Sequence, residues 1–135
     1  MLMILSPAKT LDFESPLPTR RRSTPVCSKQ ASEVIDSLLK LSRKELAGRM
    51  KLKPELAETT HQQYSDWQQR PTVKNARPAA LAYRGNAFVG LDASTFSDDE
   101  FLFAQDSLRI LSGLYGILRP LDLIQPYRLE MAMKL

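Results

Sequence analysis

Two glycines, Gly113 and Gly116, stand three residues apart inside an otherwise apolar run, and they constrain the fold more than any other feature of the chain. Glycine adopts positive φ without strain and lets backbone groups approach a ligand closely, because it has no Cβ atom. The run therefore predicts a tight hairpin. Two interpretations stay open: a helix C-cap followed by an ordinary turn, or a turn whose backbone N–H groups hold a phosphate.

A helix is expected to lead into this hairpin. Ser97 and Glu100 form the pattern of a capping box, and three acidic residues in the first turn complement the helix dipole. Apolar residues at helical spacing extend the predicted helix from Asp98 to Leu111. Arg119 follows three residues after Gly116, within reach of an anion held by the hairpin.

The rest of the chain mixes helical and extended patterns. Helices are expected where apolar residues recur every three or four positions, or where a capping box or an early proline marks a start: residues 31–39, a short helix after Ser42, and residues 54–69. Strands are expected at residues 2–5, 81–83 and 127–134. The sequence thus predicts a helix-rich α+β fold with few strands, as a single domain over residues 1–135.

Composition narrows the class of protein. The 43% hydrophobic and 25% charged content is typical of a globular chain, and no apolar run approaches the ~18–20 residues of a membrane span. The N-terminus lacks the pattern of a secretory signal, so a cytoplasmic location without membrane association is expected. The single His61 and single Cys27 provide neither a disulfide nor a convergent ligand set. We therefore expect no bound metal, no cofactor and no recognisable nucleophilic triad.

Positive charge is concentrated in the first part of the chain. Residues 1–53 hold eleven basic and five acidic side chains, whereas residues 92–106 hold five acidic and no basic ones. This asymmetry favours a protein that meets a polyanion with one face, although an unevenly charged solvated surface explains it equally well. Arg20, Arg21 and Arg22, in a proline-rich polar segment, are candidate phosphate contacts. The alternative is an exposed loop whose like charges stay apart.

Lys9 is a further candidate. It follows the first predicted strand in the segment Ser6-Pro7-Ala8-Lys9, and α/β proteins often place ligand sites after a strand. The segment lacks the glycine-rich frame of a P-loop. Lys9 is therefore either a phosphate contact or a turn residue that is solvated or pairs with Asp12.

Three motifs resemble one known family. They are the opening run Met1 to Asp12, the segment Thr95-Phe96-Ser97 with its capped helix, and the run Leu111 to Gly116 that continues through Pro126 to Met131. They closely resemble the bacterial YaaA family of peroxide stress response proteins. The resemblance covers nearly the whole chain, most loosely between Arg20 and Lys74, and family members are about twice this long.

The resemblance implies a mixed α/β fold with a helix-hairpin-helix element, of the kind that DNA repair proteins use to grip the DNA backbone. The element would span residues 98–122, with its hairpin at Ser112 to Gly116. Gly113 and Gly116 would approach phosphate, with Arg119 and Arg128 as charge partners. The chain departs from the usual hairpin, because two residues rather than one separate the glycines. Alanine also stands at position 132, where the family usually has glycine.

The resemblance also implies a role, because members of this family are associated with lower free intracellular iron and limited oxidative DNA damage during peroxide stress. They are also associated with binding of DNA, including distorted duplexes. The expected function is therefore non-enzymatic, sequence-independent DNA binding during peroxide stress, through Ser112, Gly113, Gly116, Arg119, Arg128, Lys9 and Arg20 to Arg22. The alternative is an enzyme for a small phosphorylated or nucleotide-like substrate, with Lys9 and the glycine hairpin facing one cleft. A third possibility is that this part of the protein is partly unfolded alone.

Overall fold

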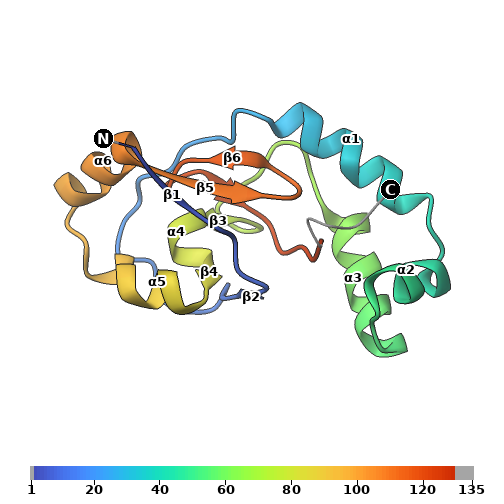
Figure 1. Cartoon of the computed structure of the whole chain (residues 1–135). Helices are drawn as coiled ribbons and strands as arrows, with labels where there is room; N and C mark the ends of the chain where they lie inside the picture. Colours follow the sequence, from blue (N-terminus) through green and yellow to red (C-terminus); the bar gives the residue numbers. More distant parts are fainter. Residues whose placement is uncertain (1, 130–135) are drawn as a thin grey trace.

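The computed structural model, which describes residues 2–129, has the mixed α+β class that the sequence predicts. Its helices are α1 (Ser28–Leu39), α2 (Arg43–Met50), α3 (Pro54–Asp66), α4 (Ala79–Ala82), α5 (Asn86–Leu91), the 3-10 helix η1 (Ala93–Thr95) and α6 (Asp98–Ser107). Its strands are β1 (Met3–Leu5), β2 (Thr10–Leu11), β3 (Arg77–Pro78), β4 (Tyr83–Arg84), β5 (Leu108–Ser112), β6 (Gly116–Leu118) and β7 (Leu123–Ile124). Helices α1 to α3 lie at one end and α5 and α6 at the other, with the strands between them (Figure 1).

Strand β5 is the centre of the main sheet, whose order is β1-β5-β6. It runs parallel to β1, with Leu5 opposite Ile110, and antiparallel to β6, with Ser112 opposite Gly116. Along β5, Leu108, Ile110 and Ser112 are buried, the period of two that a strand requires. Two short antiparallel pairs, β2 with β4 and β3 with β7, hold the remaining strands.

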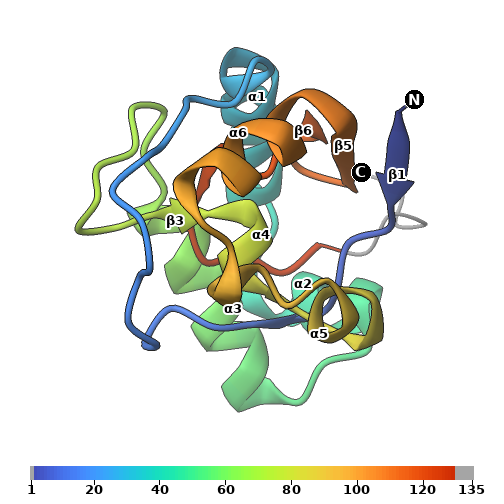
Figure 2. The same cartoon turned by 90° about the vertical axis from the view of Figure 1, so that its left-hand side faces the viewer.

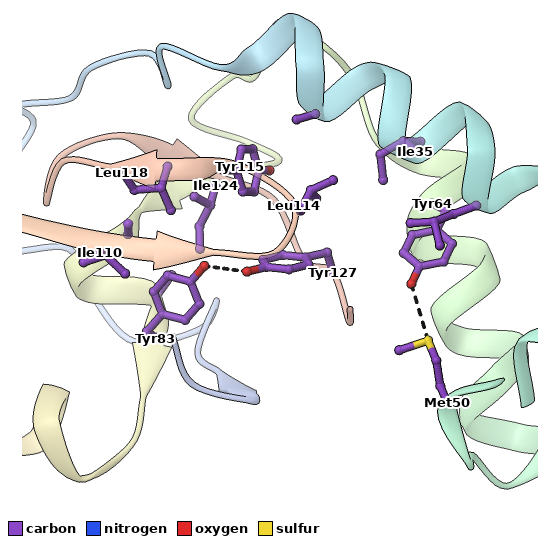
Figure 3. Packing of buried hydrophobic residues seen from close by; sticks show 14 of the residues in the cluster. Ile35, Met50, Tyr64, Tyr83, Ile110, Leu114, Tyr115, Leu118, Ile124 and Tyr127 are labelled. Carbon is purple, nitrogen blue, oxygen red and sulfur yellow. Dashed lines mark hydrogen bonds between the residues drawn. The ribbon is translucent and has the colours of Figure 1, made fainter. Parts of the chain in front are cut away.

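The core fills the space between this sheet and helices α1 to α3 (Figure 3). Aromatic side chains form much of it, and their polar ends are bonded to one another. The hydroxyl of Tyr127 lies 2.6 Å from that of Tyr83 and 2.8 Å from Oγ of Ser112, and Trp67 Nε1 donates to the Tyr115 hydroxyl at 2.9 Å. These polar atoms are therefore satisfied inside the core, as buried groups must be.

Local start signals were reliable predictors. Helices α2 and α6 both begin with complete capping boxes, at Ser42 with Glu45 and at Ser97 with Glu100. Pro54 occupies the first turn of α3, and the first predicted strand is β1. These signals need only neighbouring residues, which is why the sequence reveals them.

The predicted end of the helix before the hairpin was wrong. Helix α6 stops at Ser107 instead of Leu111, and the next five residues form β5. The same apolar residues that fit a helical face instead gain strand partners on both sides, which local periodicity cannot reveal. The Arg109 guanidinium reinforces this end, because Nη1 donates to the carbonyls of Gln105 and Leu108 at 2.7 and 2.8 Å.

The expected helix-hairpin-helix over residues 98–122 is corrected accordingly: one helix leads into a β-hairpin made by β5 and β6. The strand expected at 81–83 is also wrong, since buried alanines form the short helix α4 and extended structure begins only at Tyr83. Alanine favours the helical turn. Of the strand expected at 127–134, residues 127–129 are not extended into a sheet, and the others lie outside the described residues.

Candidate functional site

The turn of the β5–β6 hairpin faces the protein interior. Leu114 and Tyr115 at its tip are only 3% and 2% exposed and belong to the core (Figure 3). Oγ of Ser112 accepts hydrogen bonds from the backbone N–H groups of both residues, at 3.2 and 3.1 Å. The two residues between the glycines therefore serve packing, and their N–H groups are bonded within the turn.

Gly116 is the glycine that makes this turn possible. Its φ is 73°, whereas Gly113 does not have positive φ. A Cβ atom at Gly116 would meet Cys27 Sγ at 3.5 Å, an ordinary contact, so the constraint is conformational.

Replacing Gly116 with alanine should lower the free energy of unfolding by about 1–2 kcal/mol, the cost of a left-handed conformation for an L-residue. Gly48→Ala is the matched control, because Gly48 lies within helix α2 with open space around it. That control should raise stability by about 0.5–1 kcal/mol. Urea denaturation measures both, and equal shifts for the two variants would contradict the role given to Gly116.

Arg119 is engaged inside the structure. Its Nη2 donates to Asp122 Oδ1 and to the carbonyl of Thr24, both at 3.0 Å. Asp122 is fully buried and also accepts from the Arg119 backbone N–H at 2.8 Å and from Ser23 Oγ at 2.6 Å. Arg119 and Asp122 thus fix the segment that carries the arginine triplet against the turn before β7.

Arg128 and Lys9 lie elsewhere. Arg128 is half-buried, and its carbonyl accepts a hydrogen bond from the Tyr64 hydroxyl. Burial raises the pKa of Tyr64, and the nearby Arg128 charge opposes that shift. Lys9 is exposed in the bend that joins β1 to β2. The predicted site residues are therefore distributed over several places, and the hairpin is not their meeting point.

The arginine triplet lines a hollow of about 410 Å³, together with Leu17, Thr19, Val73, Ala76, Pro78 and Leu123. We call this the arginine hollow. The segment after β2 and the one leading into β3 lie close together (Figure 2), and residues of both line the hollow. Thr19 Oγ1 donates to Asp98 Oδ1 at 3.0 Å, and Arg21 Nε lies 3.5 Å from Asp98 Oδ2. The first residue of α6 thereby orients one arginine of the three.

A buried arginine that the sequence reasoning missed lies next to this hollow. Arg77, in β3, is 5% exposed, and burial lowers its pKa. It lines a cavity of about 400 Å³ with Phe13, Gln63, Trp67, Lys74, Asn75 and others, which we call the Arg77 cavity. The sequence did indicate an unusual position, because Arg77 is the only charged residue in the apolar run 76–82. A charged residue is almost never fully buried unless it is paired.

Asp12 is the nearest acid to Arg77, but it is held by other groups. Its Oδ2 pairs with Arg84 Nη2, and its Oδ1 accepts from the N–H groups of Glu14 and Ser15 at 2.9 and 3.1 Å. The Arg84 hydrogen bond is the largest cause that holds the Asp12 pKa well below its usual range. Arg77 Nη1 remains 3.9 Å from Asp12 Oδ1, too far for a hydrogen bond.

Within residues 2–129 no group of three or more histidine, cysteine, aspartate or glutamate side chains is placed to hold a metal ion. In the same part of the chain, no helix has both the length and the apolar character that crossing a membrane requires. The Arg77 cavity brings the cations of Arg77 and Lys74 together with the Asp66 carboxylate and the aromatic rings of Phe13 and Trp67.

Comparison with known proteins agrees with the motifs. The family model of the peroxide stress protein YaaA matches residues 1–135. A curated relative, a UPF0246 protein of Colwellia psychrerythraea (strain 34H / ATCC BAA-681), is 51% identical over 135 residues. The alignment covers all of this chain and 52% of that relative, so the chain spans about half the length of the protein it matches. On both grounds, the chain belongs to the family of the peroxide stress protein YaaA.

Proposed function

We propose that the protein containing this chain acts in peroxide stress by binding DNA through its phosphate backbone, with the arginine hollow as a contact surface. The observation that supports this proposal is the hollow itself, where three consecutive arginines line one recess. Guanidinium groups match phosphate oxygens in geometry and stay charged at every physiological pH. Contacts of this kind position a protein on DNA without reading its sequence.

The guanidinium groups of the arginine triplet are available to bind phosphate. Within residues 2–129 neither Arg20 nor Arg22 forms an ion pair, and both are exposed. Arg21 pairs with Asp98, but both side chains are about half exposed, and exposed pairs of this kind contribute little. A DNA phosphate would compete with Asp98 for Arg21 at small cost.

The acidic start of α6 limits the contact to one side. Asp98, Asp99 and Glu100 occupy its first turn, where they repel a phosphate chain. DNA is therefore expected to approach the hollow from the side of Val73 and Lys74. In this proposal, bound protein covers the DNA backbone and so limits iron-dependent oxidative damage. Protection from nicking by ferrous iron and peroxide, measured in parallel with binding, tests that part.

The binding test is fluorescence anisotropy with labelled duplex and bubbled DNA over a salt series. The logarithm of affinity should fall linearly with the logarithm of salt concentration. Arg20→Ala and Arg22→Ala should each weaken binding to every sequence and reduce the slope by about 0.9. Lys44→Ala, which removes an equal charge from the exposed face of α2, is the matched control and should change neither value.

A folded chain that binds neither DNA would defeat the assignment of the contact to this part of the protein. So would binding whose salt slope is the same for Arg22→Ala as for the unaltered chain. Circular dichroism of each variant separates these outcomes from unfolding. Stronger binding to bubbled than to continuous duplex would add a preference for distorted DNA.

A further inference from the structure

We infer that the Arg77 cavity is a binding site for a small phosphorylated ring compound, of the size and chemistry of a mononucleotide. The inference goes beyond the DNA contact proposed above, because its central cation is Arg77 and not the arginine triplet, although Leu17 and Ala76 line both spaces. Three observations carry it: an underpaired buried cation, a second cation at the rim, and aromatic walls in a space of suitable volume.

Arg77 is the first observation. A guanidinium has five N–H donors. Here Nη2 reaches the Pro16 carbonyl at 3.5 Å, Nη1 lies 3.9 Å from Asp12, and the buried Nε has no hydrogen-bond partner. Asp12 cannot come closer without giving up Arg84 and two backbone N–H groups. Nε is shielded from solvent, so an anion in the cavity would instead complete the hydrogen bonds of the outer guanidinium nitrogens, whose one partner within hydrogen-bond distance among residues 2–129 is the Pro16 carbonyl.

Lys74 supplies the second charge. It is exposed at the rim of the same cavity, and no described acidic group forms an ion pair with its ammonium. The Asp66 carboxylate also lines the cavity, so a phosphate is expected on the side of Arg77 and Lys74, where the buried guanidinium and the rim ammonium would hold it by charge from two sides. The inner cation would fix its orientation and the outer cation would help it enter.

The other residues that line the Arg77 cavity suit the aromatic ring of a nucleobase. Phe13 and Trp67 are half-buried on the cavity wall, and aromatic faces bind nucleobases by stacking. Gln63 also lines the space, and no hydrogen bond in the described chain uses its side chain, so its amide is available to the edge of a base. The volume of about 400 Å³ lies within the range of small-molecule sites.

The chain carries its own reporter, because Trp67 is its only tryptophan. Titration with adenosine 5′-monophosphate should change the Trp67 fluorescence saturably, with half-saturation below about 1 mM. Inorganic phosphate alone and adenosine alone should each require at least tenfold more, because each satisfies only one part of the cavity. A single-stranded oligonucleotide, titrated separately, shows whether the ring compound enters free or as a nucleotide of a strand.

Two variants test the cations. Arg77→Met removes the buried charge with little loss of volume, and it should weaken binding more than tenfold. Lys74→Ala changes an exposed residue and should weaken binding several-fold without affecting the fold. Lys44→Ala is the control for net charge and should bind as the unaltered chain does.

Saturable binding of either the free nucleotide or the oligonucleotide that depends on Arg77 and Lys74 supports the site. The absence of a saturable change with both probes overturns it, as does binding that Lys74→Ala and Arg77→Met leave intact. If Arg77→Met does not fold, Lys74→Ala decides. Failure of this site is distinct from failure of the DNA proposal, which depends on Arg20 and Arg22 and is measured by anisotropy.

Discussion

Replacing Asp122 with alanine is expected to lower the free energy of unfolding by about 3 kcal/mol, the low end of the range for breaking a buried ion pair. Asp122 is fully buried, and its carboxylate accepts hydrogen bonds from Ser23 Oγ, the Arg119 backbone and the Arg119 guanidinium. Alanine would leave Ser23 Oγ and the Arg119 backbone N–H without this acceptor, and Arg119 Nη2 would keep only the Thr24 carbonyl. Urea denaturation followed by circular dichroism gives the value.

Asp106→Ala is the control, since Asp106 is an exposed acid on α6, and its effect should stay within about 0.5 kcal/mol. A second measurement follows the segment that Asp122 holds. Trypsin should cleave at Arg20 to Arg22 faster in Asp122→Ala than in the unaltered chain under native conditions. Equal stability and equal cleavage for the two aspartate variants would show that the segment is held by other contacts.

The second large effect concerns alkaline pH. All four tyrosines of the chain are buried, and burial is the largest cause that raises the pKa of each. For Tyr115 the pKa rises from 10.0 to about 12. The folded chain therefore holds its phenolic protons more tightly than the unfolded chain does. This stabilisation is complete below pH 10 and is lost as pH rises from 10 toward the folded pKa values.

The native chain should accordingly show little tyrosinate absorbance at pH 10, where exposed tyrosines are half ionised. Above that, tyrosinate should appear in one cooperative step that coincides with loss of the circular dichroism signal. Tyr115 alone accounts for about 2 kcal/mol of lost stability by pH 12. Gradual ionisation near pH 10 with an unchanged circular dichroism spectrum would contradict the burial of these hydroxyls.

The features that the sequence predicted correctly depend on neighbouring residues, whereas those that it missed depend on contacts between distant segments. The capping boxes at Ser42 and Ser97 depend on residues three apart, and both were identified correctly. Strand β5 is paired on one side with β1, about a hundred residues away, and local patterns do not reveal that partner, so the residues of β5 were assigned to the helix before it. The fold class was predictable from the mixture of patterns, but the pairing of the strands was not.

The same distinction applies to the residues of the candidate site. The arginine triplet could be identified from adjacent residues and does line a hollow. Arg119 was predicted as a phosphate contact of the hairpin, although Asp122, three residues on, offered a local partner that the structure uses. Arg77 and Phe13, far apart in sequence, meet at one cavity only because β3 and the segment after β2 fold together. No spacing rule brings such residues together.

The parallel pairing of β1 with β5 also sets an order in time. Met3 pairs with Leu108, so the first strand has no partner until 105 further residues have been synthesised. At about 5–20 residues per second, that wait lasts about 5–20 s. Helix α3 contacts both α1 and α2, its neighbours in the sequence, so these three helices can assemble meanwhile. Strand β1 is thus synthesised before most of the elements that surround it, yet it is among the last to be fixed in the sheet.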